Sequence, residues 1–206
     1  MNKDDILRQA HNVKKPTKAY AFQVVKDIIN RDGVASERDL ADLYAYFLPK
    51  VTKAKNWWQW LALARGQKDV RYYLNYIHSD GKRLLATDGY RVHVMLSSEY
   101  PSGYYTDEMV RVDDMDGTQY PDIDSVIPVS GLSRVDTDPG QWPIQQIGHK
   151  VYAYVLPGDT GVNKQYVDQA ISLMERPVFY VTNKTSPMLI RDEVSNHFAV
   201  IMPLKL

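Results

Sequence analysis

Apolar residues recur every three or four positions in the first quarter of the chain. In residues 18–31 this spacing puts them on one side of a helix. Ser36 and Asp39 then have the spacing of a capping box, and a second apolar stripe follows. Pro49 should stop that stripe. The pattern therefore predicts two amphipathic helices, over residues 18–31 and 36–48.

Beyond residue 50 the apolar spacing changes. A tryptophan-rich segment, residues 53–65, predicts a third helix that ends at Gly66, and Ser79-Asp80-Gly81 predicts a hairpin turn. Residues 98–150 are less regular, and the mixture as a whole indicates an α+β fold. Further strands are predicted at 72–77, 83–87, 91–95, 109–112, 126–129, 150–156, 178–182, 188–191 and 198–202, with a fourth helix at about 163–175.

Composition narrows the class of protein. The chain has 206 residues, enough for one large domain or two small ones, and 44% of them are hydrophobic. No apolar run is long enough to cross a membrane, and the first residues lack the pattern of a signal peptide. The absence of cysteine excludes disulfides, thiolate metal sites and cysteine nucleophiles. These features predict a cytoplasmic protein.

Charge is unevenly distributed although the net charge is zero. Residues 1–83 carry 16 Lys and Arg against 9 Asp and Glu, a balance of +7, and residues 84–206 carry 9 against 16, a balance of −7. A basic half can attract phosphates. Proteins with zero net charge often have such an uneven distribution of charge along the sequence, so charge alone leaves a nucleic-acid role open.

Four segments together resemble a known family. They are Leu84 to Val94 (LLATDGYRVHV), Tyr120 to Pro128 (YPDIDSVIP), Gly161 to Met174 (GVNKQYVDQAISLM) and Phe198 to Leu206 (FAVIMPLKL). Each is similar to a segment of the bacterial DNA polymerase III β sliding clamp, and they occur in the same order as in the clamp. The resemblance covers about two-thirds of the chain.

The resemblance implies a DNA-clamp-like domain built from two halves, each with a helix and antiparallel strands. We expect a helical N-terminal extension over residues 1–50 and the clamp-like domain over residues 51–206, with an irregular connection at about 98–150. The chain is then roughly one clamp-domain equivalent, because the other domains of a full clamp are not recognisable in it.

In clamps, polymerases and other partners dock a short peptide in one surface cleft. Carried over by position, that cleft would comprise Thr87, Gly89, Tyr90, Arg91, Val92, Pro121, Val126, Met188, Val200, Met202, Pro203 and Leu204. Arg91 would hydrogen-bond the peptide, and Tyr90 stands where the family often has His. A plainer interpretation is that Val200, Met202 and Leu204 alternate as in any terminal strand.

Clamps contact DNA through Lys and Arg on inner helices, which touch phosphates without reading bases. The corresponding candidates are Lys50, Lys53, Lys55, Arg65, Arg71, Lys82 and Arg83. The second helix offers only Lys164 and Arg176. Trp57 and Trp58 could stack on single-stranded bases or simply be core residues.

No motif for a cofactor, a metal ion or catalysis stands out, so we expect a non-enzymatic protein without a cofactor. The leading hypothesis is a sliding-clamp-like accessory factor, for processivity or as an adaptor, of a DNA or RNA polymerase. Its small size suggests a phage source. It could act in replication or as a transcription cofactor, either as a homo-oligomeric ring of about six copies or as a monomer.

Two alternatives remain open from the sequence. One is a monomeric decoy that inhibits the interactions of a host clamp. The other is a nucleic-acid-binding regulatory protein in which the helices at 18–31 and 36–48 form part of a helix-turn-helix.

Overall fold

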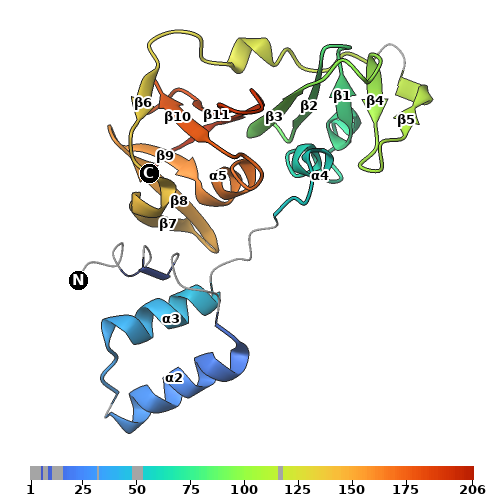
Figure 1. Cartoon of the computed structure of the whole chain (residues 1–206). Helices are drawn as coiled ribbons and strands as arrows, with labels where there is room; N and C mark the ends of the chain where they lie inside the picture. The colour runs from blue at the N-terminus through green and yellow to red at the C-terminus, as the bar shows by residue number, and fades with distance from the viewer. Residues whose placement is uncertain (1–5, 7–8, 11–15, 32, 48–52, 116–117) are drawn as a thin grey trace.

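The computed structural model describes residues 6, 9–10, 16–31, 33–47, 53–115 and 118–206. Two helices, α2 (Lys18–Asn30) and α3 (Glu37–Phe47), pack side by side and lie apart from the sheets in Figure 1. The Ser36 amide donates to the Asp39 carboxylate at 2.8 Å, and the Asp39 amide donates to the Ser36 hydroxyl at 3.2 Å. This confirms the predicted capping box and both predicted helices.

Among the described residues, the strands form two antiparallel sheets (Figure 1). The larger has nine strands, in the spatial order β5 (Arg111–Val112), β4 (Gly103–Tyr105), β1 (Ile77–Ser79), β2 (Arg83–Thr87), β3 (Arg91–Leu96), β12 (Phe198–Ile201), β11 (Met188–Asp192), β10 (Pro177–Val181) and β6 (Ser133–Val135). The smaller has four, in the order β13 (Pro203–Leu204), β9 (Thr160–Asn163), β8 (Val151–Leu156) and β7 (Ile144–Gly148).

The large sheet consists of two equivalent units. Helix α4 (Trp57–Ala62) precedes β1, β2 and β3, and helix α5 (Lys164–Ala170) precedes β10, β11 and β12. The last strands of the two units, β3 and β12, pair antiparallel, with Val92 opposite Val200. The sheet therefore has one unit on each side of this pairing, which confirms the expected architecture of two helix-plus-strands halves.

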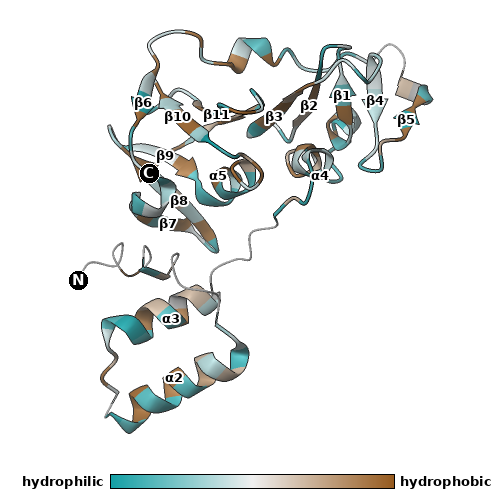
Figure 2. Ribbon diagram, viewed as in Figure 1, coloured by the Kyte–Doolittle hydropathy of each residue, from teal (hydrophilic) through white to brown (hydrophobic). Residues whose placement is uncertain are grey.

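Alternate residues of each strand enter different layers of the core. Leu84, Ala86 and Ile201 belong to the cluster that includes Trp60 and Val167, on the face covered by α4 and α5. A second cluster forms on the opposite face. It comprises Leu74, Leu85, Val92, Val94, Tyr104, Met115, Tyr120, Ile123, Leu189, Phe198 and Val200. In Figure 2 the central strands β2 and β3 are largely hydrophobic, as expected for strands buried on both faces.

The cover of the second face is irregular. It includes the short 3₁₀ turns η1 (Tyr72–Asn75), η2 (Asp113–Met115) and η3 (Asp124–Val126), with η4 (Pro139–Gln141) further along the chain. We call residues 118–132 the connecting segment. Figure 1 shows it crossing the sheet on the side away from α4 and α5.

Several predicted elements differ from the observed ones. The strand predicted at 72–77 is η1 followed by β1, and the strand predicted at 126–129 is replaced by η3 and coil. The strand predicted at 109–112 is reduced to β5, because Met109 has a φ of 66° and cannot continue a strand.

Helices α4 and α5 are both shorter than predicted. The Asn56 side chain accepts from the Gln59 amide, so α4 starts at Trp57, four residues later than predicted, and the Asn163 side chain caps α5 in the same way. Strands β4, β6, β7, β9 and β13 were not predicted. Within the part of the chain that the structure describes, no helix is long and apolar enough to cross a membrane.

Candidate functional site

A cavity of about 170 Å³ opens on the second face of the large sheet. Its walls come from four parts of the chain: η1, the turn between β2 and β3, the connecting segment, and the end of β12. The lining residues are Arg71, Leu74, Thr87, Gly89, Arg91, Val92, Pro121, Asp122, Ile123, Val126, Val200 and Met202. Most of these side chains are apolar, with a few polar groups at the edge.

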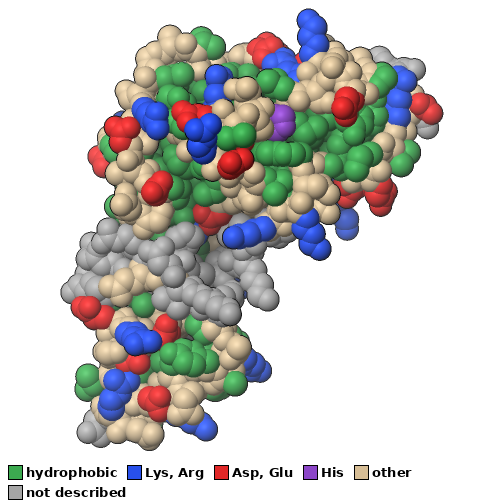
Figure 3. Space-filling model, viewed as in Figure 1, with side chains coloured by type: hydrophobic (Ala, Val, Ile, Leu, Met, Phe, Trp, Pro, Cys, Tyr) green, Lys and Arg blue, Asp and Glu red, His purple; other side chains and the backbone are tan. Residues whose placement is uncertain are grey.

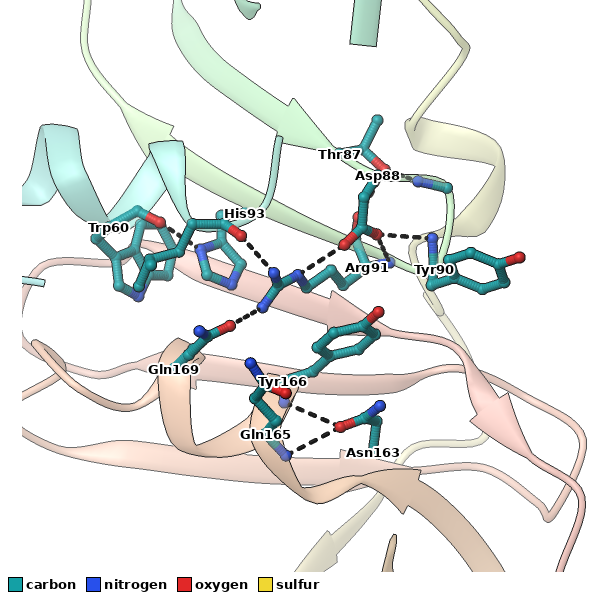
Figure 4. A network of polar contacts seen from close by, with 12 residues as sticks. Trp60, Thr87, Asp88, Tyr90, Arg91, His93, Asn163, Gln165, Tyr166 and Gln169 are labelled. Carbon is teal, nitrogen blue, oxygen red and sulfur yellow. Dashed lines mark hydrogen bonds and ion pairs between the residues drawn. The ribbon is translucent and has the colours of Figure 1, made fainter. Parts of the chain in front are cut away.

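The turn from β2 to β3 is fixed by its own polar groups (Figure 4). The Thr87 hydroxyl donates to the Arg91 carbonyl at 2.5 Å and accepts from the Gly89 amide at 3.0 Å. The Asp88 carboxylate accepts from the amides of Tyr90 at 2.9 Å and Arg91 at 3.1 Å. Hydrogen bonds within the turn therefore hold the backbone of this cavity wall.

Gly89 is required in this turn for two reasons. Its φ is +89°, a region that side chains disfavour. A Cβ at this position would also lie 3.1 Å from the Arg71 guanidinium, which sits over the turn. The close approach of Arg71 thus depends on the missing side chain.

The C-terminal segment is attached directly to the turn. The Met202 amide donates to the Tyr90 carbonyl at 2.9 Å, immediately after β12 ends at Ile201. Met202 is half-buried and lines the cavity, whereas Val200 is buried beneath it. The turn and the C-terminal segment therefore form one continuous wall.

Arg91 links this wall to the helix layer (Figure 4). Its Nε donates to Asp88 at 3.1 Å, and its two terminal nitrogens donate to the Leu63 carbonyl and the Gln169 side-chain oxygen. Its guanidinium also lies 4.1 Å from the centre of the Tyr166 ring, a cation–π contact. Burial lowers the pKa of Arg91, while Asp88 opposes that shift.

The position of Arg91 also suits the two helices. Neither α4 nor α5 has a basic residue in its last turn. Arg91 donates to the carbonyl of Leu63, which caps α4, and to the side chain of Gln169 in the last turn of α5, so its cation lies at the negative end of the α4 dipole and beside α5. Because the guanidinium is bonded within the chain, this geometry does not support the expectation that Arg91 hydrogen-bonds a docked peptide.

The structure brings together eight of the twelve predicted cleft residues: Thr87, Gly89, Arg91, Val92, Pro121, Val126, Val200 and Met202. The other four do not line the cavity. Tyr90 is 65% exposed and lies outside it, and Pro203 and Leu204 form β13 and border a separate cavity with Lys205.

Met188 needs a specific correction. It is fully buried in the helix-side core, while its neighbour Leu189 belongs to the cavity-side cluster. Strand residues alternate between faces, so the Met188 side chain lies on the face opposite the cavity. The placement of Pro203 and Leu204 likewise shows that the terminus is not one simple alternating strand, because β12 and β13 belong to different sheets.

Sequence reasoning missed four lining residues. Arg71 and Leu74 lie at η1, which was predicted as a strand, so their orientation could not be inferred. Asp122 and Ile123 lie inside the YPDIDSVIP segment that carried the resemblance. That segment contained the signal needed to find them.

Ion pairs and aromatic contacts hold the rim of the cavity. Arg83 donates to both oxygens of Asp124 at 2.7 and 2.8 Å, and this contact holds the pKa of Asp124 below its usual value. Tyr120 stacks on His78 at 4.7 Å between ring centres, and burial raises the pKa of Tyr120 and lowers that of His78. The connecting segment is thus fixed to strands β1 and β2 of the large sheet.

Three of the predicted DNA-binding residues are paired with carboxylates within the chain. Arg65, Arg71 and Arg83 are engaged in ion pairs with Asp107, Asp69 and Asp124 at 2.7 to 2.9 Å. Lys53, Lys55 and Lys82 are exposed, and Lys50 lies outside the described residues. On the face shown in Figure 3, basic and acidic side chains are interspersed rather than separated.

Helices α4 and α5 carry few basic side chains that could contact a phosphate. Helix α4 contains no Lys or Arg. The one cation of α5, Lys164, is buried and pairs with Asp168 at 2.5 Å, and burial lowers its pKa.

Trp58 is a core residue. It is 5% exposed, and its indole N–H donates to the Thr106 carbonyl at 3.2 Å, so its ring is not available for stacking on a base. Trp57 is half-buried against His197, with ring centres 4.6 Å apart. The described His, Asp and Glu side chains form no group of three or more that could hold a metal ion.

No protein-family model and no curated protein matches the chain. The chain does match solved structures of bacterial sliding clamps. The DnaN sliding clamp (DNA polymerase III subunit β) of Bartonella birtlesii, bound to griselimycin, is 18% identical with a TM-score of 0.51, over 72% of this chain and 63% of that chain. The β sliding clamp of C. crescentus, with PEG bound to a putative β-motif tethering region, is 18% identical with a TM-score of 0.51, over 71% and 61%.

A sliding clamp of Pseudomonas aeruginosa, with ligand, is 17% identical with a TM-score of 0.49, over 79% of this chain and 70% of that chain. The chain therefore spans about 61% to 70% of the length of these clamps. At sequence identities this low, the structural similarity establishes the fold alone. The chain has the fold of a bacterial DNA polymerase III β sliding clamp, as the resemblance of the four segments predicts.

Proposed function

We propose that the chain is a non-catalytic accessory factor of a DNA or RNA polymerase, which docks a short peptide of a partner protein in the cavity beside Met202. The observation that carries the proposal is the convergence of the turn at residues 87–91, the connecting segment and the end of β12 on one cavity. These are the segments in which the sequence resembles the peptide-docking cleft of clamps.

The chemistry of the cavity suits an extended peptide with apolar side chains. Val92, Val126 and Val200 supply an apolar lining, and Met202 is an adaptable side chain at its edge. Such sites gain affinity from buried apolar groups and specificity from a few polar groups at the rim. That the B. birtlesii clamp was obtained with griselimycin bound agrees with a ligand-binding role for this fold.

Contact with DNA is the second part of the proposal and has narrower support. The helices α4 and α5 present no exposed cation in the described structure, so phosphate contact would rest on exposed lysines such as Lys53 and Lys55 beside α4. Contact of that kind is non-specific and falls steeply with salt.

The experiment starts from a random hexapeptide display library selected on the purified chain. The affinity of an enriched peptide is then measured by fluorescence anisotropy with wild-type protein and with Met202→Asp. A carboxylate in the apolar wall should weaken binding by on the order of 2 kcal/mol, about thirtyfold.

Val110→Asp is the matched control, because Val110 is 58% exposed and does not line the cavity. It should bind the peptide as wild-type does. If Met202→Asp folds normally and keeps full affinity, or if no peptide is enriched, peptide docking in this cavity is wrong.

A further inference from the structure

Gln169 is a buried polar residue on the layer opposite the cavity. It lies on α5, is 4% exposed, and does not line the cavity. Its side-chain oxygen accepts a hydrogen bond from Arg91 (Figure 4). Buried amides need such partners, and here the partner belongs to the other half of the sheet.

A continuous set of contacts runs from this amide to the cavity wall. Arg91 is bonded to Asp88, and Asp88 holds the amides of the turn that carries Thr87 and Gly89. The carbonyl of Tyr90 in the same turn accepts from the Met202 amide at 2.9 Å. Four short polar contacts therefore separate Gln169 from the residue at the centre of the docking proposal.

Around Gln169, hydrogen bonds join helix α4 to helix α5. The Trp60 indole donates to the Ala170 carbonyl at 2.6 Å, and Arg91 also bonds the Leu63 carbonyl at the end of α4. The last turns of α4 and α5 are thus fixed to each other beside Gln169. A guanidinium held between such groups has one geometry, since its donors point in fixed directions.

We propose that Gln169 is a positioning residue for the cavity, acting through Arg91 to set the place of the wall formed by the 87–91 turn and Met202. The inference rests on the proposed peptide docking and extends it. Binding in the cavity and the packing of α5 are then linked, so each changes with the other.

Gln169→Met tests this directly, because it keeps the length of the side chain and removes the acceptor. Peptide affinity should fall by about fivefold or more, the lower range of coupling between linked sites. Gln169→Glu retains an acceptor for Arg91 and should restore affinity. Gln165→Met, on the exposed side of the same helix, should change affinity by less than about twofold.

A second measurement needs no peptide. The ¹³C-methyl resonance of Met202 should shift in Gln169→Met but not in Gln165→Met, while the exposed Met109 stays in place in both. If Gln169→Met does not fold, Gln169→Asn provides a milder change, because it withdraws the amide oxygen from Arg91 by one methylene.

The outcomes separate the two proposals. Full affinity and an unchanged Met202 resonance in a folded variant without the acceptor would overturn the role of Gln169. A shifted Met202 resonance in a protein that binds no peptide would instead overturn the docking function and leave the positioning role standing.

Discussion

The two faces of the large sheet are built from the same strands but closed in different ways. Helices α4 and α5 cover one face, where Trp60 and Leu61 are fully buried. The irregular connecting segment covers the other through Tyr120 and Ile123 and leaves the cavity beside Val200. Large buried side chains pack under the helices, whereas the face under the connecting segment contains the cavity.

Trp60→Ala should produce the largest effect, because it opens a large void on the closed face and removes a buried hydrogen bond to Ala170. We expect the free energy of unfolding to fall by about 3–5 kcal/mol in urea titrations. Met202→Ala on the open face should cost only roughly 1 kcal/mol. Equal losses at the two positions would contradict the difference between the faces.

His93 makes the closed face sensitive to acid. Burial, with Arg91 adding to it, lowers the pKa of His93 to about 3 from an ordinary value of 6.5, and its Nδ1 contacts the Trp60 carbonyl at 2.7 Å. Between those two values the unfolded chain binds the extra proton and the folded chain does not. The free energy of unfolding should therefore decrease as pH falls below 6.5, by about 2 kcal/mol at pH 5.

Urea titrations at pH 7 and pH 5 measure this decrease. His93→Asn should reduce it, whereas His149→Asn, at an exposed position, should leave it intact. Burial also lowers the pKa values of His78 and His197, so some acid sensitivity should persist in His93→Asn. The same dependence in both variants would exclude His93 as its main source.

The ion pair that holds the connecting segment should have the smallest effect. Asp124→Asn weakens the contact with Arg83, which keeps its other partner Asp80 at 2.7 Å. We expect a loss of at most about 1 kcal/mol that disappears near 1 M salt. Asp136→Asn, which alters a looser and more exposed pair with Arg134, should change nothing measurable. A large loss at Asp124 that salt does not reduce would show that the open face depends on this pair.

The sequence was most informative where local pattern and resemblance agreed. Strands β2 and β3 were predicted closely, because a short apolar run between turn residues is a local signal. Strands as short as β4 and β6 were missed, since three residues carry no readable period and are stabilised by pairing with distant strands.

The sequence indicated which segments form the cavity, but it was less informative about which of their side chains line it. Val200 and Met202, which the resemblance assigned to the cleft, line the cavity, whereas Met188 lies on the opposite face of the sheet, and the resemblance did not reveal that face. The inward role of Arg91 depends on Gln169, 78 residues away, and no local pattern reveals such a contact.

The pairing of Val92 with Val200 has a consequence for how the protein folds. These residues are more than a hundred positions apart, so the ends of a long loop must meet before the pairing forms. Contacts of that kind slow folding and form only as the molecule nears its native topology. Because both residues line the cavity, a partly folded chain that lacks this pairing cannot form the cavity, and a ligand bound there would report completed folding.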